Sequence, residues 1–301
     1  MLEFSPVTIN DKPIIDRCVL QQNSRSADFN FGNIYIWNKH YRQLYTEYSG
    51  RVITRLRNHD HPSFAFPVGS GDLKTSIDAL IEYCAQVSYP LVLFGVEEEN
   101  VHELMRLYPS KFIYEYNEAQ SDYIYLAEKL ATFSGKALHQ KKNHCNRFEA
   151  ENPSWSFRPI TRDTIPACLD MLEHWIEQND DRLDRSIVYE HDAIVRAFAA
   201  YESLGLEGGA LYIEDRLVGF TVGEMISSDC FDVHFEKAFP EINGGYTMVC
   251  REFCRQLLET HPALTYINRE DDMGLESLRR SKQSYKPEYL LKKFTAIMPR
   301  V

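Results

Sequence analysis

The stretch "ALYIEDRLVGFTVGEMI" (residues 210–226) contains two apolar arms separated by a short polar segment at Asp215-Arg216. This pattern predicts a β-hairpin. A further strand is expected at "CFDVHFEKAF" (230–239). Before the hairpin in the chain we expect a strand at 154–160 and helices at 162–178 and 189–204. After the strand at 230–239 follow the loop "PEINGGY" (240–246), a helix to about 259, a strand at 264–268, a short helix at 274–285 and a final strand at 289–298.

The first half of the chain has a similar mixture of elements. Two strands are expected around Ser49-Gly50, a helix from Asp72 to about Val87, a strand in "PLVLFGV" (90–96) and a helix near 98–107. The chain has 301 residues, and domains of roughly 150 residues suggest that it contains two. We expect an α+β (mixed α/β) protein with domains at 1–127 and 154–301, joined by a basic connecting segment at 128–153.

Composition and charge limit the classes of function. Hydrophobic residues make up 44% and charged residues 26%, as in ordinary globular proteins. The net charge of −11 disfavours a non-specific nucleic-acid binder, so a polyanionic partner has to meet a local basic patch. Seven cysteines without a CxxC motif indicate reduced core thiols. No apolar stretch reaches the roughly 20 residues that span a bilayer, so we expect a cytoplasmic protein without an integral membrane segment.

The strand at 230–239 carries the first candidate catalytic groups. Strict alternation places Asp232, His234 and Glu236 on one face. If that face lines a cleft, a carboxylate or the imidazole can accept a proton from an attacking amine. If the face is only solvated, these residues have no special role.

Two other segments suggest anion binding. Gly244 and Gly245 stand at the entrance of a helix, where backbone N–H groups favour a phosphate or an oxyanion, although a glycine pair is also a common flexible connection. The segment "KALHQKKNHCNRF" (136–148) is basic and contains no acid. It predicts either a phosphate-docking helix or a solvated one. No HExxH motif occurs and the histidines are scattered, so we expect no bound metal.

A charged stretch near the C-terminus, "TYINREDDMGLESLRRSKQSYKP" (265–287), is too rich in charge for surface stability alone. Asp271 or Asp272 is expected to cap a helix that ends before Pro287. That helix would present Arg279, Lys282 and Lys286 on nearby turns to a charged ligand.

Together with "VHFEKAFPEINGGYTMVCREF" (233–253) and "GKALHQKKNHCNRF" (135–148), this stretch resembles the family of the C-terminal catalytic domain of phosphatidylglycerol lysyltransferases. The resemblance covers essentially the whole chain. It implies two tandem GCN5-related N-acyltransferase-like domains, similar also to the Fem aminoacyltransferases, and the element order of 154–298 matches that fold. The lysyltransferases move an aminoacyl group from tRNA to a lipid.

The candidate site residues combine the residue chemistry with this resemblance. The candidate catalytic residues are Glu236, His234, Asp232 and Tyr285. The candidate donor-binding or substrate-binding residues are Lys141, Lys142, Lys237, Gly244, Gly245, Tyr246, Asn268, Arg269, Asp271, Asp272, Arg279, Lys282 and Lys286.

Three hypotheses follow for function. The leading one is an acyl or aminoacyl transferase, with aminoacyl-tRNA as donor through the basic patch and a small-molecule or peptide amine or hydroxyl as acceptor. The first alternative is an acyl-coenzyme A dependent N-acetyltransferase. The second is a non-catalytic ligand-binding protein of the same fold. No tightly bound cofactor is expected in any of them, and the oligomeric state stays open.

Overall fold

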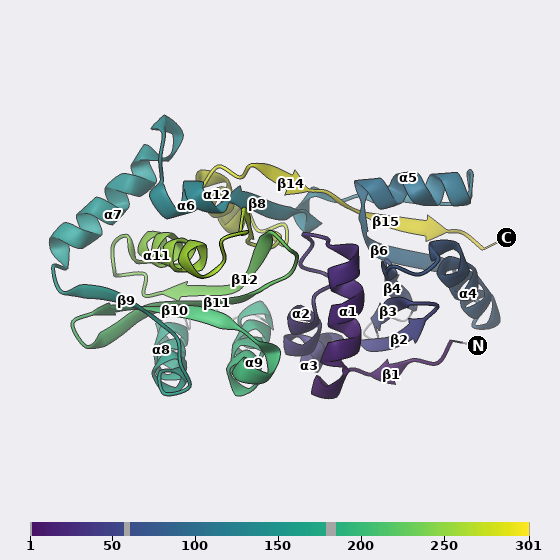
Figure 1. Ribbon diagram of the computed structural model, residues 1–301, viewed down its shortest axis with the longest axis horizontal. Helices are drawn as coiled ribbons and strands as arrows, with labels where there is room; N and C mark the ends of the chain where they lie inside the picture. Colours follow the sequence, from purple (N-terminus) through teal and green to yellow (C-terminus); the bar gives the residue numbers. More distant parts are fainter. Residues whose placement is uncertain (1, 57–60, 179–184, 301) are drawn as a thin grey trace. The chain divides into compact units, whose positions relative to one another are not determined.

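Strand pairing divides the chain into two units, each with its own sheet, in a computed structural model that describes residues 2–56, 61–178 and 185–300 (Figure 1). The first unit comprises Met1–Asp122, Asp271–Leu278 and Leu290–Val301, and the second comprises Tyr123–Glu270 and Arg279–Tyr289. These units do not follow the expected limits at 127 and 153. Residues 128–153 lie within the second unit, and two late segments belong to the first.

The first unit has an eight-stranded sheet in the order β1-β2-β3-β4-β6-β15-β7, with β5 paired to β3. Its last strand in sequence, β15, lies between β6 and β7 and pairs with both in antiparallel fashion. The strands are β1 (Ser5–Pro6), β2 (Leu44–Tyr48), β3 (Arg51–Leu56), β4 (Ser63–Ala65), β5 (Val68–Gly69), β6 (Leu91–Glu97), β7 (Ile113–Tyr116) and β15 (Lys293–Met298).

The local signals of the first half are confirmed. Ser49 and Gly50 take positive φ values of 52° and 73° in the turn between β2 and β3, and Asp72 caps α4 by accepting the Thr75 N–H at 2.8 Å. The helical segments are η1 (Ile9–Asp11), α1 (Lys12–Gln22), α2 (Phe31–Ile36), α3 (Asn38–Tyr41), α4 (Leu73–Gln86), α5 (Glu98–Leu107) and η2 (Glu118–Gln120).

The second unit has a seven-stranded sheet in the order β14-β8-β13-β12-β11-β10-β9. The predicted hairpin is the pair β10 and β11. β13 pairs in parallel with β12 and in antiparallel fashion with β8. The strands are β8 (Asp122–Leu126), β9 (Trp155–Pro159), β10 (Glu207–Ile213), β11 (Arg216–Met225), β12 (Cys230–Ala238), β13 (Tyr266–Asn268) and β14 (Tyr289–Leu291).

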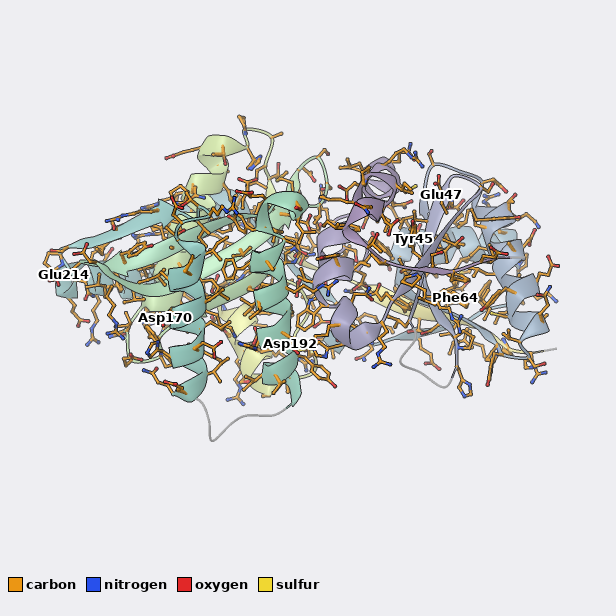
Figure 2. The ribbon with its side chains drawn as sticks, turned by 90° about the horizontal axis from the view of Figure 1, so that it is seen from below. Tyr45, Glu47, Phe64, Asp170, Asp192 and Glu214 are labelled. Atoms are coloured by element: carbon orange, nitrogen blue, oxygen red, sulfur yellow. The ribbon has the colours of Figure 1, made fainter. Side chains whose placement is uncertain are left out.

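Helices cover both faces of this second sheet. α11 lies on one face, and α8 and α9 lie side by side on the other (Figure 1). Figure 2 shows α8 and α9 from below, with Asp170 labelled on α8 and Asp192 on α9. The helical segments are α6 (Ala127–Thr132), η3 (Lys136–Leu138), α7 (His139–Glu151), α8 (Ile165–Glu177), α9 (Arg185–Ala199), α10 (Tyr201–Leu204), α11 (Gly245–Thr260) and α12 (Glu276–Ser284), the last of which begins in residues of the first unit.

One expectation for the C-terminus was wrong. Residues 289–298 form two strands in different sheets rather than one final strand: β14 completes the second sheet and β15 the first. The buried ammonium of Lys293 opens β15 and lies 2.8 Å from the Asp122 carboxylate and 3.1 Å from that of Asp28. The two carboxylates compensate the buried charge at the first residue of β15.

The mixed α/β architecture predicted from the sequence is confirmed. All seven cysteines are buried as free thiols. Large aromatic side chains, including Phe64 in the first unit and Phe220 in the second, are completely buried in the two cores. Among the described helices, none combines the length and apolar character that crossing a membrane requires.

Candidate active site

A β-bulge in β12 decides where the candidate catalytic residues point. The pairs across β11 and β12 are Thr221 with Glu236, Val222 with Phe235, Gly223 with Val233 and Glu224 with Asp232. β12 therefore contains one extra residue, His234, opposite a regular stretch of β11. Thr221 and Glu224 are three residues apart, so they lie on opposite faces. Glu236 and Asp232 consequently face opposite sides of the sheet, which overturns the expected shared face.

Packing identifies the helices on each side. Gly219, two residues before Thr221, approaches Val249 of α11, and a Cβ at Gly219 would lie 2.9 Å from that side chain. Phe220 instead packs against Phe198 of α9, with ring centroids 5.5 Å apart. Glu236 therefore lies on the face covered by α11, and Asp232 lies on the face covered by α8 and α9.

On the α11 face, Glu236 is the centre of a group that we call the Glu236 cluster: Glu236, Arg269, Lys141, Lys282 and Tyr285. Arg269 Nη2 donates to Glu236 Oε1 at 2.8 Å, and both side chains are nearly buried, with 12% and 11% exposed. Lys282 of α12 donates its Nζ–H to the backbone carbonyl of Arg269. Glu236 of β12 and Lys282 of the late helix thus both contact Arg269 within the second unit.

Two cations lie over the Tyr285 ring. Lys141 Nζ is 3.6 Å from the ring centroid, and Arg269 Cζ is 4.5 Å from it. Both distances suit cation–π attraction, which is stronger where water is excluded. Lys141 reaches the ring from α7, which is held to α11 by an ion pair between Glu149 and Arg251. Lys141 is therefore turned inward and contacts the ring, rather than projecting to a phosphate in solvent.

Burial sets the protonation behaviour of the cluster. It raises the pKa of Glu236, and the charges of Arg269, Lys141 and Lys282 oppose that rise without cancelling it. Burial, followed by the charge of Arg269, lowers the pKa of Lys141 to about 8. Burial also raises the pKa of Tyr285 far above its ordinary value. A phenol with such a pKa stays protonated at neutral pH and is poorly matched to proton transfer, so Tyr285 suits a positioning role.

Two polar atoms next to Glu236 have no hydrogen-bond partner among the described residues. They are Arg269 Nη1 and Thr221 Oγ1, and both are buried. Thr221 is completely buried and lies directly across from Glu236 in the ladder. Because buried polar groups are almost always paired, two unpaired donors beside a carboxylate indicate a place for an acceptor group of a ligand.

The opposite face holds a different group, the His234 cluster: His234, Asp232, Glu224 and Glu270. His234 Nε2 lies 3.1 Å from Glu224 Oε1, and Nδ1 lies 3.4 Å from Asp232 Oδ2 and 3.3 Å from Glu270 Oε1. Burial alone would lower the pKa of His234, but the carboxylates of Asp232, Glu224 and Glu270 raise it well above its ordinary value. An imidazole whose pKa is raised in this way keeps its proton at neutral pH, so His234 is a poor base.

Two more predicted residues point toward α8 and α9. Lys237 Nζ lies 2.7 Å from Glu190 Oε2 and 4.1 Å from the ring centroid of Trp175. Trp175 Nε1 donates to the Tyr246 hydroxyl at 3.2 Å. Lys237 and Tyr246 therefore both contact Trp175 of α8.

Close packing against α7 requires glycine at position 244, the first residue of the glycine pair. Gly244 has a φ of +80° at the N-cap of α11, and a Cβ there would lie 2.7 Å from the carbonyl oxygen of His144 in α7. Gly245 donates its N–H to Ile242 at 3.0 Å. The close approach of α7 thus accounts for glycine at position 244.

The remaining predicted residues occupy varied positions. Asn268 is buried and its Oδ1 accepts the Glu270 N–H at 2.6 Å. Asp271 and Asp272, in the first unit, accept the N–H groups of Met273 and Gly274 at 3.0 and 2.8 Å and so shape a turn before α12. Lys142 and Lys286 are exposed and Arg279 is half-buried.

Sequence reasoning missed three contributors, which are Thr221, Glu224 and Tyr125, whereas it placed Glu270 with Asn268 and Arg269 at the end of a strand, arranged to hold a charged ligand. The Tyr125 hydroxyl donates to the Lys282 carbonyl at 2.8 Å, and Arg269 Cζ lies 5.8 Å from the Tyr125 ring centroid. Tyr125 lies in the nearly continuous apolar run of β8. That run predicts a buried side chain but not its partners.

Comparison with known proteins finds one matching family model and several similar proteins. The family model described as "Phosphatidylglycerol lysyltransferase, C-terminal" matches residues 21–297. A conserved protein of unknown function from Bacteroides thetaiotaomicron is 33% identical, with a TM-score of 0.94 over 99% of this chain and 100% of the other. An uncharacterised protein of Mycoplasmoides gallisepticum is 31% identical over 59% of this chain and 56% of its own length.

A more distant structure has the same fold. The C-terminal domain of a candidate lysylphosphatidylglycerol synthetase from Agrobacterium fabrum superposes with a TM-score of 0.67 at 11% identity, covering 97% of this chain and 92% of the other. The chain therefore shares the fold of that domain.

Proposed function

Because the chain belongs to the family of phosphatidylglycerol lysyltransferase C-terminal domains, we propose that it transfers an aminoacyl group from aminoacyl-tRNA to an amine or hydroxyl acceptor at the Glu236 cluster. The family and the fold are those of acyl and aminoacyl transferases. The observation that carries the proposal is a buried carboxylate of raised pKa beside two unpaired buried donors.

In the proposed reaction, Glu236 accepts the proton of the attacking amine or hydroxyl. A bond forms between that atom and the carbonyl carbon of the aminoacyl ester. As the tetrahedral intermediate collapses, the ester C–O bond breaks and Glu236 returns the proton to the departing ribose oxygen. A raised pKa suits this exchange because the base is then poised nearer neutral pH.

Arg269 and Thr221 stabilise the charge that develops on the carbonyl oxygen. Arg269 Nη1 and the Thr221 hydroxyl are the two donors available for that oxygen. Tyr285 and Lys282 hold the guanidinium in place, the first through its ring and the second through the Arg269 carbonyl. The oxygen is thus bound by groups that need little rearrangement.

The exposed lysines of the basic segment would contact the tRNA backbone. Lys136 and Lys142 are exposed, whereas Lys141 contacts Tyr285. Arg147 already pairs with Glu151 at 2.7 Å, although both side chains remain partly exposed. The local basic patch is therefore smaller than the sequence suggested.

The test supplies aminoacyl-tRNAs and acetyl-coenzyme A separately to the full chain, together with amine and hydroxyl acceptors, and measures transfer of label. We expect transfer from aminoacyl-tRNA, and a fall of at least about 100-fold in Glu236→Gln because a general base is lost. Glu241→Gln is the matched control, since Glu241 lies in an exposed loop and its carboxylate is 3.6 Å from Arg216.

Other outcomes would replace the proposal. Transfer from acetyl-coenzyme A alone would identify an N-acetyltransferase. Thermal stabilisation by a donor without turnover would identify a binding protein of the same fold. Unchanged transfer in Glu236→Gln would remove Glu236 from the role of base.

A further inference from the structure

The His234 cluster brings together a set of metal ligands that the transferase proposal does not use. Its members come from three adjacent strands: Glu224 from β11, Asp232 and His234 from β12, and Glu270 two residues after β13. One nitrogen of His234 and one carboxylate oxygen each from Asp232 and Glu270 all lie within 4.8 Å of one another. The His234 and Asp232 side chains are completely buried, and Glu224 is 8% exposed.

The distances suit a metal ion. With metal–ligand bonds of about 2.1 Å, two ligands of a tetrahedral site lie about 3.4 Å apart. The observed separations from His234 Nδ1 are 3.4 Å to Asp232 Oδ2 and 3.3 Å to Glu270 Oε1. The Glu270 side chain is 25% exposed, so the cluster is open to solvent at this ligand.

The other ring nitrogen of His234 is held by a carboxylate. His234 Nε2 lies 3.1 Å from Glu224 Oε1. If Nε2 donates its proton to Glu224, Nδ1 keeps a lone pair that points toward the Asp232 and Glu270 oxygens. A carboxylate that holds the remote nitrogen of a ligating imidazole is the usual support of a protein metal site.

The backbone fixes the same arrangement. The bulge at His234 places its ring beside Asp232. Glu270 adopts a positive φ of 55°, donates its N–H to Asn268 Oδ1 at 2.6 Å and accepts the Tyr123 N–H at 3.1 Å. Both features direct side chains from separate strands to one point.

We propose that His234, Asp232 and Glu270 bind a divalent transition-metal ion through His234 Nδ1 and one oxygen of each carboxylate, with Glu224 orienting the imidazole. Two carboxylates neutralise the ion, which reduces the cost of burying its charge. A mixed imidazole and carboxylate set favours zinc, manganese or iron(II) over magnesium and calcium, which prefer oxygen ligands alone. Three protein ligands leave at least one coordination position for water or a small ligand.

The test measures Zn²⁺ and Mn²⁺ binding to the full chain after chelation and dialysis, by calorimetry and elemental analysis, with Mg²⁺ for comparison. We expect one Zn²⁺ or Mn²⁺ per chain and much weaker Mg²⁺ binding. Glu224→Gln should weaken binding roughly 10- to 100-fold, as for other outer carboxylates, and Asp232→Asn should weaken it more. His261→Gln is the matched control, because it removes an imidazole that lies 2.7 Å from Glu207.

A measurement on the unmodified chain does not depend on how the variants fold. In ¹⁵N spectra of labelled histidine with excess Zn²⁺, His234 should show a protonated Nε2 and a metal-bound Nδ1. A ring protonated on both nitrogens under those conditions, or no bound ion by elemental analysis, would overturn the proposal and leave His234 as an imidazolium paired with carboxylates only.

Discussion

The two faces of the second sheet carry opposite charge arrangements on neighbouring residues of one strand. On the α11 face, Glu236 is surrounded by the cations Arg269, Lys141 and Lys282. On the α8 and α9 face, one imidazole is surrounded by three carboxylates. The bulge at His234 directs the two groups to opposite faces of the sheet. The comparison teaches that one inserted residue in a strand can turn an apparent triad into two separate sites.

The first prediction concerns the buried ion pair of the α11 face. Arg269→Met leaves Glu236 without its closest partner, and we expect a loss of about 3–5 kcal/mol in the free energy of unfolding, measured by urea denaturation. The control is Arg216→Met, whose exposed pair with Glu241 should cost less than about 1 kcal/mol.

A second variant sharpens this result. Combining Arg269→Met with Glu236→Leu removes both charges, and most of the lost stability should return. An Arg269→Met chain as stable as the parent would mean that the pair is solvated and that the two faces differ less than the structure indicates.

The second prediction concerns Lys237, the neighbour of Glu236 that points to the other face. Lys237→Met removes a cation from Glu190 and from the Trp175 ring, and we expect a loss of about 1–2 kcal/mol in the free energy of unfolding. Aminoacyl transfer should stay within about twofold of the parent. A large loss of transfer with intact folding would show that the α8 and α9 face takes part in the reaction.

The third prediction concerns pH. The pKa of Lys141 is lowered to about 8 by burial and then by the charge of Arg269, whereas an unfolded lysine titrates near 10.4. Between these values the unfolded chain binds more protons, so the contribution of Lys141 to stability rises with pH from about 8 upward. Solvent screening at this half-buried site limits the change to roughly 1 kcal/mol or less.

Urea denaturation at pH 7, 8, 9 and 10 tests this sign. The free energy of unfolding of the parent should include the contribution that rises with pH above about 8, and that of Lys141→Met should lack it. The matched control is Lys142→Met, which removes the adjacent exposed lysine and should keep the parent profile. Equal pH profiles for the parent and Lys141→Met would place Lys141 in solvent.

The fourth prediction has the smallest effect. Lys142→Ala should leave stability unchanged and weaken tRNA binding slightly, lowering the slope of log affinity against log salt by about 0.7–0.9 if one phosphate contact is lost. Filter binding at several salt concentrations measures the slope. Glu151→Ala is the control, because it removes a charge elsewhere on α7 and should not reduce the slope.

Local sequence signals predicted much of the fold. The hairpins at Ser49-Gly50 and Asp215, the cap at Asp72 and the helix after Gly244 follow from turn, cap and periodicity rules that act over a few residues. The division of 289–298 between two sheets was missed, because the pattern of a strand does not specify which sheet it joins.

The candidate site was predicted only in part. Glu236, Arg269, Lys282, Tyr285 and Lys141 were all named from sequence and do come together. Their roles as base, oxyanion donor and positioning residues stay predictions. Thr221 was missed because its relation to Glu236 depends on the register between two strands.

The sequence by itself determined the mixed α/β class, most elements and the family, because these depend on short-range periodicity and on local motifs that can be recognised along one chain. Only the tertiary structure decided which side each residue of β12 faces, since side-chain direction has a period of two and one bulged residue reverses it. The same bulge turned the His234 imidazole away from Glu236 and placed it among Glu224, Asp232 and Glu270. No local pattern records that contact, because its members come from three strands.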